Sequence, residues 1–378
     1  MFGNQYLAVD IGNRNIKAVH GGVSNKKIEI KEYGIFDTPA NSIRDGKITN
    51  VSAVADSIRM FVEKNRIKAK KLILNVTGTG VITRDILLPQ SNEDEVEKML
   101  EYEAQQYFPV DLKNYVLDFK LMEDITSDEG RFTRVLLVAV PVKQVDEYMK
   151  LPGLMKMEPA AVDIPANCIS KLVSYLDFHL TDETAAEYAV VDIGCETVGV
   201  SIFNRNVLKF NRILLNGSGD IDRLISENYS MSPAEAEKKK IASALVVPEE
   251  SDGSLSIEDA RMSNIVKPAV DAVISDINRF FDFYLSRSTG NKIGRIYLCG
   301  GGSRLKGLPE YISAYFNIPV EFLTPGSNIV YRGSKGQEAF LNDYVLITGA
   351  VGATVRNGSA GRGISGVLKD LLKPGKPL

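Results

Sequence analysis

Two aspartates occupy matching positions far apart in the sequence. Asp10 lies in the run Tyr6-Leu-Ala-Val-Asp-Ile-Gly12 and Asp192 lies in Tyr188-Ala-Val-Val-Asp-Ile-Gly194, so five of seven positions are identical at an offset of 182 residues. In each copy an apolar run ends at Asp and Gly and is followed by a second apolar run, which predicts a strand, a tight turn and a strand. A carboxylate at the end of an apolar strand needs a partner. A metal ion bound to a polyphosphate would supply that partner if the two turns face each other.

We name these segments the first turn and the second turn. Backbone amides after their glycines, Gly12 and Gly194, can hold phosphate oxygens. The polar side chains that can join them are Asn13, Asn15, Lys17 and Thr197. Magnesium prefers oxygen ligands and keeps several waters, so Asp10 and Asp192 suit it as metal ligands through water. The alternative is a pair of ordinary hairpin turns, in which Asp and Gly are common, but the matched pair favours a binding site.

A glycine-rich loop is the third candidate, and it begins directly after the predicted strand Arg295–Cys299. Its candidate binding residues are Gly300, Gly301, Gly302 and Ser303. Without side chains, the glycines let a flat base or a ribose lie against the backbone, and Ser303 can cap the helix that follows. The loop lacks the GKS or GKT of a Walker A motif and is not a GxGxxG with an acidic residue about 20 positions later. The alternative is a turn that packs a strand closely against a helix.

Alternating strand and helix patterns position these candidates. Lys27–Phe36 and Lys70–Val76 have the pattern of strands and flank a predicted helix, which favours an α/β architecture. The second half repeats this plan after the second turn. A glycine turn there adds Gly217 and Gly219 to the cofactor-binding candidates, and Pro268 is expected in the first turn of a long helix.

The pattern changes between Arg84 and Pro165. Ile86-Leu-Leu88 leads into a helix with one apolar stripe, and Tyr115–Met122 and Thr133–Val140 then have the pattern of strands. A helix followed by two strands predicts a compact α+β insert of roughly 80 residues within the first half.

Composition limits the classes of function. With 378 residues, 44% hydrophobic and 25% charged, the chain is ordinary for a soluble globular protein of at least two domains. A net charge of -3 and a pI near 5.7 disfavour nucleic acid as a partner. The three cysteines are far apart and in no metal-ligand spacing, which disfavours a disulfide framework and a zinc site. With no signal-peptide pattern and no apolar run near 18 residues, we expect a cytoplasmic protein.

The order of these elements resembles the actin, hexokinase and DnaK-type chaperone superfamily of nucleotide-binding proteins. In that comparison the two turns correspond to phosphate loops, and Gly300–Gly307 corresponds to the adenosine loop. Glu237 and Lys240, three apart on one helical face, resemble a pair that touches ribose and adenine. Glu158-Pro-Ala-Ala and Ile347-Thr-Gly-Ala-Val-Gly352 resemble the connecting segments. The resemblance implies a two-lobed, ribonuclease H-like duplicated α/β fold that binds ATP and Mg²⁺.

Within this superfamily the insert resembles that of FtsA and, more specifically, of the PilM family. The segments that carry this resemblance are Arg84–Pro89, Glu103–Pro109, Leu117-Asp118 and Ala161–Asp163. The PilM family is the actin-like, ATP-binding component of type IV pilus assembly. The resemblance covers nearly the whole chain and implies a cytoplasmic scaffold that captures the N-terminal segment of a PilN-like membrane protein on the insert. Asn13-Arg-Asn15 and Cys195-Glu196 depart from the small residues usual in the two phosphate loops.

The resemblance also sets the expected domains and partners. Residues 1–83 and 166–187 form the first lobe, 84–165 the insert, 188–356 the second lobe and 357–378 a tail. The partner-binding candidates on the edge of the insert are Arg84, Ile86, Leu87 and Leu88, where a peptide would combine side-chain pockets with backbone pairing. The pilus motor, other assembly proteins and a second copy of the chain are further partners that the resemblance allows. The protein is expected to associate with the membrane only peripherally, through a partner at the inner face of the cytoplasmic membrane.

Catalysis is expected to be slow ATP hydrolysis at most. Asp163 and Glu158 are candidates for orienting the attacking water, by their position before the second turn alone. One rival is an FtsA-like, membrane-tethered filament protein of cell division, whose amphipathic tail would lie in residues 363–373; a packed or disordered tail is the alternative there. The other rival is a small-molecule kinase of the same superfamily.

Overall fold

The computed structural model describes residues 5–177, 187–248, 255–287 and 292–356. The chain divides into two compact units. Within the described residues, the first unit comprises 5–177, 326–340 and 349–356, and the second comprises 341–348 and those described between 187 and 325. The chain therefore returns to the first unit after completing most of the second, whereas the sequence placed all of residues 188–356 in one lobe. The expected tail, 357–378, lies outside the described residues.

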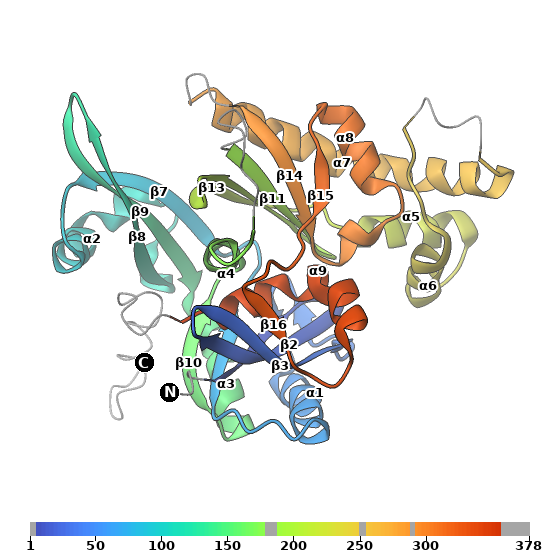
Figure 1. The fold of residues 1–378 in the computed structure, drawn as a ribbon, viewed down its shortest axis with the longest axis horizontal. Coiled ribbons are helices and arrows are strands. Elements are labelled where there is room, and N and C mark those ends of the chain that lie inside the picture. The colour runs from blue at the N-terminus through green and yellow to red at the C-terminus, as the bar shows by residue number, and fades with distance from the viewer. Residues whose placement is uncertain (1–4, 178–186, 249–254, 288–291, 357–378) are drawn as a thin grey trace. The chain divides into compact units, whose positions relative to one another are not determined.

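The first unit is built on a six-stranded sheet with the order β10-β6-β1-β2-β3-β16. Figure 1 labels β2, β3, β10 and β16 of this sheet. Its strands are β1 (Tyr6–Ile11), β2 (Asn15–Ser24), β3 (Lys27–Asp37), β6 (Lys71–Asn75), β10 (Glu158–Asp163) and β16 (Ile329–Tyr331). Strands β1, β2 and β3 form an antiparallel meander, and β6, β10 and β16 join the sheet in parallel to their neighbours. The short hairpin of β4 (Ile43–Arg44) and β5 (Lys47–Ile48) forms a sheet of its own.

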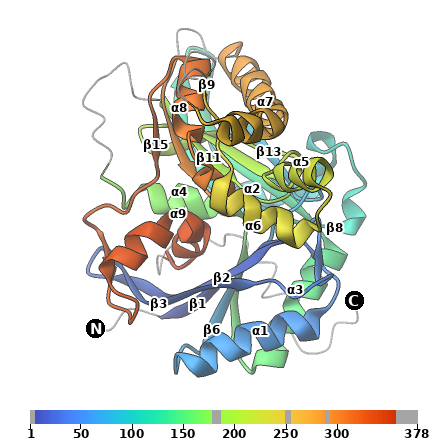
Figure 2. The same ribbon diagram turned by 90° about the vertical axis from the view of Figure 1, so that its right-hand side faces the viewer.

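Helices cover both faces of this sheet (Figure 2). The covering helices are α1 (Val51–Lys64) and α3 (Val142–Met155) on one face, and α4 (Pro165–Val173) and α9 (Gln337–Ala353) on the other. Helix α1 begins where the Asn50 side chain accepts the N–H of Ala53, and it buries Val54, Ile58 and Phe61 at helical spacing. Both faces of the parallel strands are therefore apolar, as a doubly covered sheet requires.

The insert of the first unit is a separate three-stranded antiparallel sheet with the order β7-β9-β8. Its elements are β7 (Ile82–Pro89), α2 (Glu93–Tyr107), the 3-10 turn Leu112–Asn114, β8 (Tyr115–Ser127) and β9 (Gly130–Pro141). Helix α2 begins with a capping box between Asn92 and Glu95, and it packs Val96 and Leu100 on alternate residues of β7 and β9. Strands β7 and β8 form the two edges of this sheet.

Two strands lie outside the lobes that the sequence assigned to them. Strand β10 falls within the expected insert, 84–165, but pairs in parallel with β6 of the six-stranded sheet. Strand β16 falls within the expected second lobe but pairs with β3. A short strand has too few residues for its hydrophobic pattern to indicate which strand it pairs with. The sheet that it joins is decided by the tertiary context.

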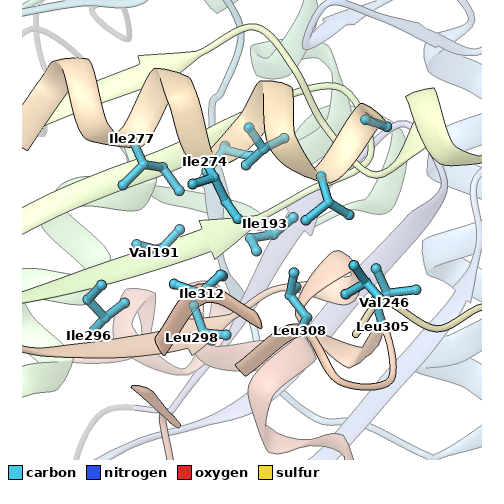
Figure 3. Packing of buried hydrophobic residues seen from close by; sticks show 14 of the residues in the cluster. Val191, Ile193, Val246, Ile274, Ile277, Ile296, Leu298, Leu305, Leu308 and Ile312 are labelled. Carbon is cyan, nitrogen blue, oxygen red and sulfur yellow. The ribbon is translucent and has the colours of Figure 1, made fainter. Parts of the chain in front are cut away.

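The second unit holds a five-stranded sheet with the order β13-β12-β11-β14-β15. Its strands are β11 (Glu187–Ile193), β12 (Val198–Asn204), β13 (Val207–Leu214), β14 (Ile293–Cys299) and β15 (Val320–Phe322). Its helices are α5 (Gly219–Tyr229), α6 (Pro233–Ser243), α7 (Ile257–Leu285) and α8 (Leu308–Phe316). Figure 3 shows Val191 and Ile193 of β11 among side chains of α7, β14 and α8 in one apolar core.

Helix α7 begins earlier than the sequence predicted. Ser256 caps it by accepting the N–H of Asp259, and Pro268 lies inside the helix and not in its first turn. A proline in a helix removes one backbone hydrogen bond. The buried stripe from Met262 to Tyr284 continues on both sides of Pro268, and this burial keeps the helix continuous.

Candidate functional site

The first turn is closed by a hydrogen bond from the N–H of Gly12 to the carbonyl of Asn15, at 3.1 Å. A Cβ placed on Gly12 would lie 3.0 Å from that carbonyl oxygen and 3.0 Å from Lys17 Nζ, so a side chain here would displace one of them. Asp10 and Lys17 are directly paired across β1 and β2. Lys17 Nζ lies 3.3 Å from Asp10 Oδ2. The turn, whose residues 12–15 are half-buried, thus holds one carboxylate and one ammonium.

The second turn repeats this geometry. The N–H of Gly194 donates to the carbonyl of Thr197 at 2.9 Å, and a Cβ on Gly194 would lie 2.9 Å from the same oxygen. Asp192 pairs with Gly199 at the position that corresponds to Lys17. The duplication therefore extends to the backbone, while glycine replaces lysine at the position that matches Lys17.

The turn that follows β13 packs directly on the second turn. Its N–H groups at Ser218 and Gly219 donate to the carbonyls of Gly194 and Cys195, both within 2.9 Å. A Cβ on Gly217 would lie 2.3 Å from the Cys195 carbonyl oxygen. Gly217 and Gly219 therefore allow the start of α5 to approach the second turn closely, and its first N–H groups are paired with that turn.

The glycine-rich loop meets the second turn from β14. Gly300 has φ +83°, and a Cβ there would lie 2.3 Å from Asp192 Oδ1; a Cβ on Gly302 would lie 2.4 Å from Ile193 Cγ2. These two glycines are thus required by packing against the protein itself. Gly301 is exposed, and the nearest atom to its Cβ would be Leu346 Cδ2 at 3.7 Å. Gly301 is therefore the member of the loop whose backbone is open to a ligand.

Ser303 has a different role from the one predicted. Its buried hydroxyl donates to the carbonyl of Gly300 at 2.7 Å and closes the 3-10 turn Gly301–Arg304. Helix α8 begins later, with Gly307 in the left-handed region as its N-cap. The sequence missed this because a serine before an apolar run predicts a cap equally well for a turn or a helix.

Lys240 is engaged within the second unit. Its Nζ lies 2.8 Å from Asp222 Oδ1 and 3.3 Å from the carbonyl of Ser218, and it joins α6 to α5. Glu237 precedes it on the same helix and is half-buried. This ion pair orients the start of α5. A ligand that contacted Lys240 would therefore share the ammonium with Asp222. Asp222 was not among the predicted residues; its position in an apolar helical stripe is the signal that identifies it.

Three polar residues end neighbouring parallel strands of the first unit. Asp10, Asn75 and Asp163 occupy one row of β1, β6 and β10, because Asn75 is paired with both aspartates. Glu158 is paired with Lys71 at the opposite end of β10. About five residues at 3.3 Å each separate Glu158 from this row, so the structure does not bring it to the first turn.

Asp163 is buried and held by three donors. The Lys171 ammonium lies 2.7 Å from its Oδ2, and the Asn167 amide and the Ile164 N–H each donate to its Oδ1 at 2.8 Å. Burial alone would raise the pKa of this carboxyl, but Lys171 and the hydrogen bonds lower its pKa overall. A carboxylate with lowered pKa and committed oxygens is a poor base. Its geometry favours holding α4 against the sheet.

The partner-binding candidates of the insert separate into two groups. Ile86 and Leu88 are buried in the core between the insert sheet and α2, whereas Leu87 is 55% exposed. Arg84 Nε donates to the carbonyl of Tyr107 at 3.0 Å and so links β7 to α2. Strand alternation explains this division. Of the four candidates, Leu87 is therefore the one with an apolar side chain that a partner can reach.

The residues of the first turn fit a magnesium-bound nucleotide. The turn backbone and Lys17 can supply donors to phosphate oxygens, and the Asp10 carboxylate is a hard oxygen ligand of the kind that magnesium takes. No group of three or more His, Cys, Asp or Glu side chains in the described part of the chain is arranged to hold a metal by itself.

The family comparison decides the identity of this fold. The model of the family "Type IV pilus assembly protein PilM" matches residues 8–357. The chain belongs to the PilM family. The predicted family and the predicted actin-like α/β fold are both confirmed.

Relatives at lower similarity agree with this assignment. Cell division protein FtsA of Bacillus subtilis is 24% identical over 252 residues, which cover 62% of this chain and 57% of that protein. FtsA of Neisseria meningitidis serogroup B is 22% identical over 355 residues, covering 85% and 84%. This chain thus spans little more than half the length of the first of these relatives.

Solved structures share the fold of this PilM family member. A chain of the PilM-PilN type IV pilus biogenesis complex superposes with a TM-score of 0.77 at 21% identity, covering 92% of this chain and 97% of that one. The ethanolamine utilization protein EutJ of Carboxydothermus hydrogenoformans gives a TM-score of 0.53 at 11% identity, covering 94% and 90%. Among the described residues, no helix is long and apolar enough to span a bilayer.

Proposed function

We propose that this protein is an ATP-binding scaffold of type IV pilus assembly that binds the N-terminal segment of a PilN-like membrane protein. The membership of residues 8–357 in the PilM family is the observation that carries the proposal. The PilM-PilN title of the similar structure names the partner of that protein, and we extend it to this chain. Such a protein works in the cytoplasm and reaches the inner face of the membrane through its partner.

ATP binding rests on the two turns and the glycine-rich loop. The first turn offers Asp10 and Lys17, the second offers Asp192 beside the start of α5, and Gly301 offers an open backbone for the adenosine. When bound, magnesium would neutralise phosphate charge. Asp163 is committed to Lys171, so the described geometry supports a nucleotide that is held and slowly hydrolysed at most.

Partner binding rests on β7 of the insert. It is an edge strand of its sheet, and edge strands present backbone groups with which an extended peptide can pair. Leu87 is exposed on this strand, while Ile86 and Leu88 anchor it in the insert core. An edge strand with one exposed leucine suits a short apolar segment.

The peptide contact is tested by titrating a synthetic N-terminal segment of the PilN-like protein from the same organism. We expect Leu87→Asp to weaken binding by about tenfold or more, as for a central apolar contact. Tyr102→Ser is the matched control, because Tyr102 is 86% exposed on α2 of the same insert. Equal affinity for wild type and Leu87→Asp would reject this edge, and no binding to any form would reject the PilN-like partner.

A further inference from the structure

Asn75 interrupts an apolar layer. On one face of the sheet, Ile73 of β6 packs beside Ala8 of β1 and Ala161 of β10, against Cys168 of α4. Asn75 is the next residue on that face, because side chains alternate along a strand. It is fully buried. A polar residue at this position must therefore find its hydrogen bonds within the protein or from a ligand.

Only one end of the Asn75 amide has a partner within the described chain. Its Oδ1 accepts a hydrogen bond from the Cys168 thiol at 3.2 Å. Its Nδ2 is buried and has no hydrogen-bond partner among the described residues. A buried unpaired donor costs free energy, and a native structure that retains one usually has a reason for it.

The unpaired donor and the Asp10 carboxylate face the same point. A Cβ placed on Gly349 of α9 would lie 3.5 Å from Asn75 Nδ2 and 3.9 Å from Asp10 Oδ2, and its own helix aside it would meet no other described atom within 4 Å. Asp10 and Asn75 are also directly paired in register. The carboxylate oxygen nearest to this point is the one that Lys17 contacts at 3.3 Å, which is long for a charge-assisted hydrogen bond.

We propose that Asn75 is a positioning residue for Asp10 in the nucleotide site. When Lys17 turns to a bound phosphate, the Asn75 amide donates to Asp10 Oδ2 and keeps the carboxylate oriented toward the magnesium hydration shell. The missing side chain of Gly349 leaves room for this movement. The inference rests on the proposed nucleotide site and adds a residue that no turn motif contains.

The test is the affinity for a fluorescent ATP analogue, measured with magnesium and with EDTA. Asn75→Val and Asn75→Thr form a matched pair, because both side chains are β-branched and suit a strand, but only threonine keeps a donor. We expect Asn75→Val to weaken magnesium-dependent binding by about tenfold, Asn75→Thr to weaken it less, and neither to change binding in EDTA. Ile73→Val, on the same face of β6, is the packing control and should leave the affinity unchanged.

A double-mutant cycle with Asp10→Asn shows whether Asn75 acts through Asp10. In the Asp10→Asn background, Asn75→Val should cause no further loss. Two results would overturn the role of Asn75 and leave the nucleotide site intact. One is a full further loss of affinity for the ATP analogue when Asn75→Val is added to Asp10→Asn. The other is wild-type affinity of Asn75→Val although Asp10→Asn binds weakly. Wild-type affinity of Asp10→Asn itself overturns the proposed site and the inference with it.

Discussion

Lys17 Nζ lies 3.3 Å from Asp10 Oδ2, at positions paired directly across the first turn. Both side chains are one-fifth exposed, so the ion pair is accessible from solvent. Lys17 is thus the cation that pairs with Asp10 beside the first turn.

We predict that Lys17→Met weakens ATP binding by about tenfold or more, because a hydrogen bond to a charged group is lost, and leaves adenosine binding unchanged. Calorimetric titration of both ligands measures this. Lys27→Met is the control, since Lys27 is exposed on β3 of the same sheet. Equal losses for ATP and adenosine would show that Lys17 supports the fold and not the phosphate.

Gly349→Ala should separate stability from binding. A Cβ at Gly349 makes only ordinary contacts, and alanine in place of glycine within a helix gains about 1 kcal/mol. We therefore expect a more stable protein with weaker binding of magnesium-ATP, because the methyl group fills the space beside Asp10 and Asn75. Thermal unfolding and ATP titration measure the two effects.

Gly352→Ala is the matched control on α9. Its Cβ would lie 2.1 Å from the carbonyl oxygen of Cys168, so this variant should be destabilised. A destabilised Gly349→Ala, or one that binds magnesium-ATP as tightly as wild type, would contradict the geometry described here.

The ion pair of Asp163 and Lys171 should be structural. Lys171→Met leaves a buried carboxylate without its cation, and such a change costs about 3–5 kcal/mol of unfolding free energy. ATP affinity of the folded protein at low temperature should stay within twofold of wild type. Denaturant unfolding and ATP titration measure these quantities. A stable variant that had lost ATP hydrolysis would instead support a catalytic role for Asp163.

Asp118 should make the stability of the protein decrease as the pH rises. Burial raises the pKa of this carboxyl to about 8, with smaller contributions from Asp163, Glu93 and Glu97 and an opposing hydrogen bond from the Phe119 N–H. The unfolded carboxyl titrates near 3.8. Between these two pKa values the native state holds one proton more than the unfolded state. The stabilisation that Asp118 contributes is therefore complete below pH 3.8 and is lost as the pH rises through 8.

Asp118→Asn keeps the shape and removes this proton. Comparing denaturant unfolding from pH 5 to 8, we expect the slope of stability against pH to become less negative by up to about 1.4 kcal/mol per unit. Asp128→Asn, in an exposed turn of the insert, is the control and should keep the wild-type slope. Identical slopes for Asp118→Asn and wild type would show that Asp118 is ionised in the native protein.

The sequence predicted the elements whose signal is local. The two turns follow from the repeat around Asp10 and Asp192, and the third loop follows from three consecutive glycines. The insert follows from a change of pattern after Arg84. These signals are visible in one chain because turn geometry restricts the residues that can form it.

Residues that act through packing were less visible. Asn75 and Asp222 gain meaning only from strands and helices brought beside them, and the division of Ile86 and Leu88 from Leu87 depends on which face of β7 meets α2. The role of Ser303 depends on a turn that the sequence cannot distinguish from a helix start. Tertiary context decided each of these.

Calorimetric titration of magnesium-ATP into wild type, Asp10→Ala and Asp192→Ala tests the central claim most directly. The two turns are proposed to serve one nucleotide, so we predict that each variant weakens magnesium-dependent binding while far-UV circular dichroism and thermal unfolding show an intact fold. Unchanged affinity in both variants would contradict the account.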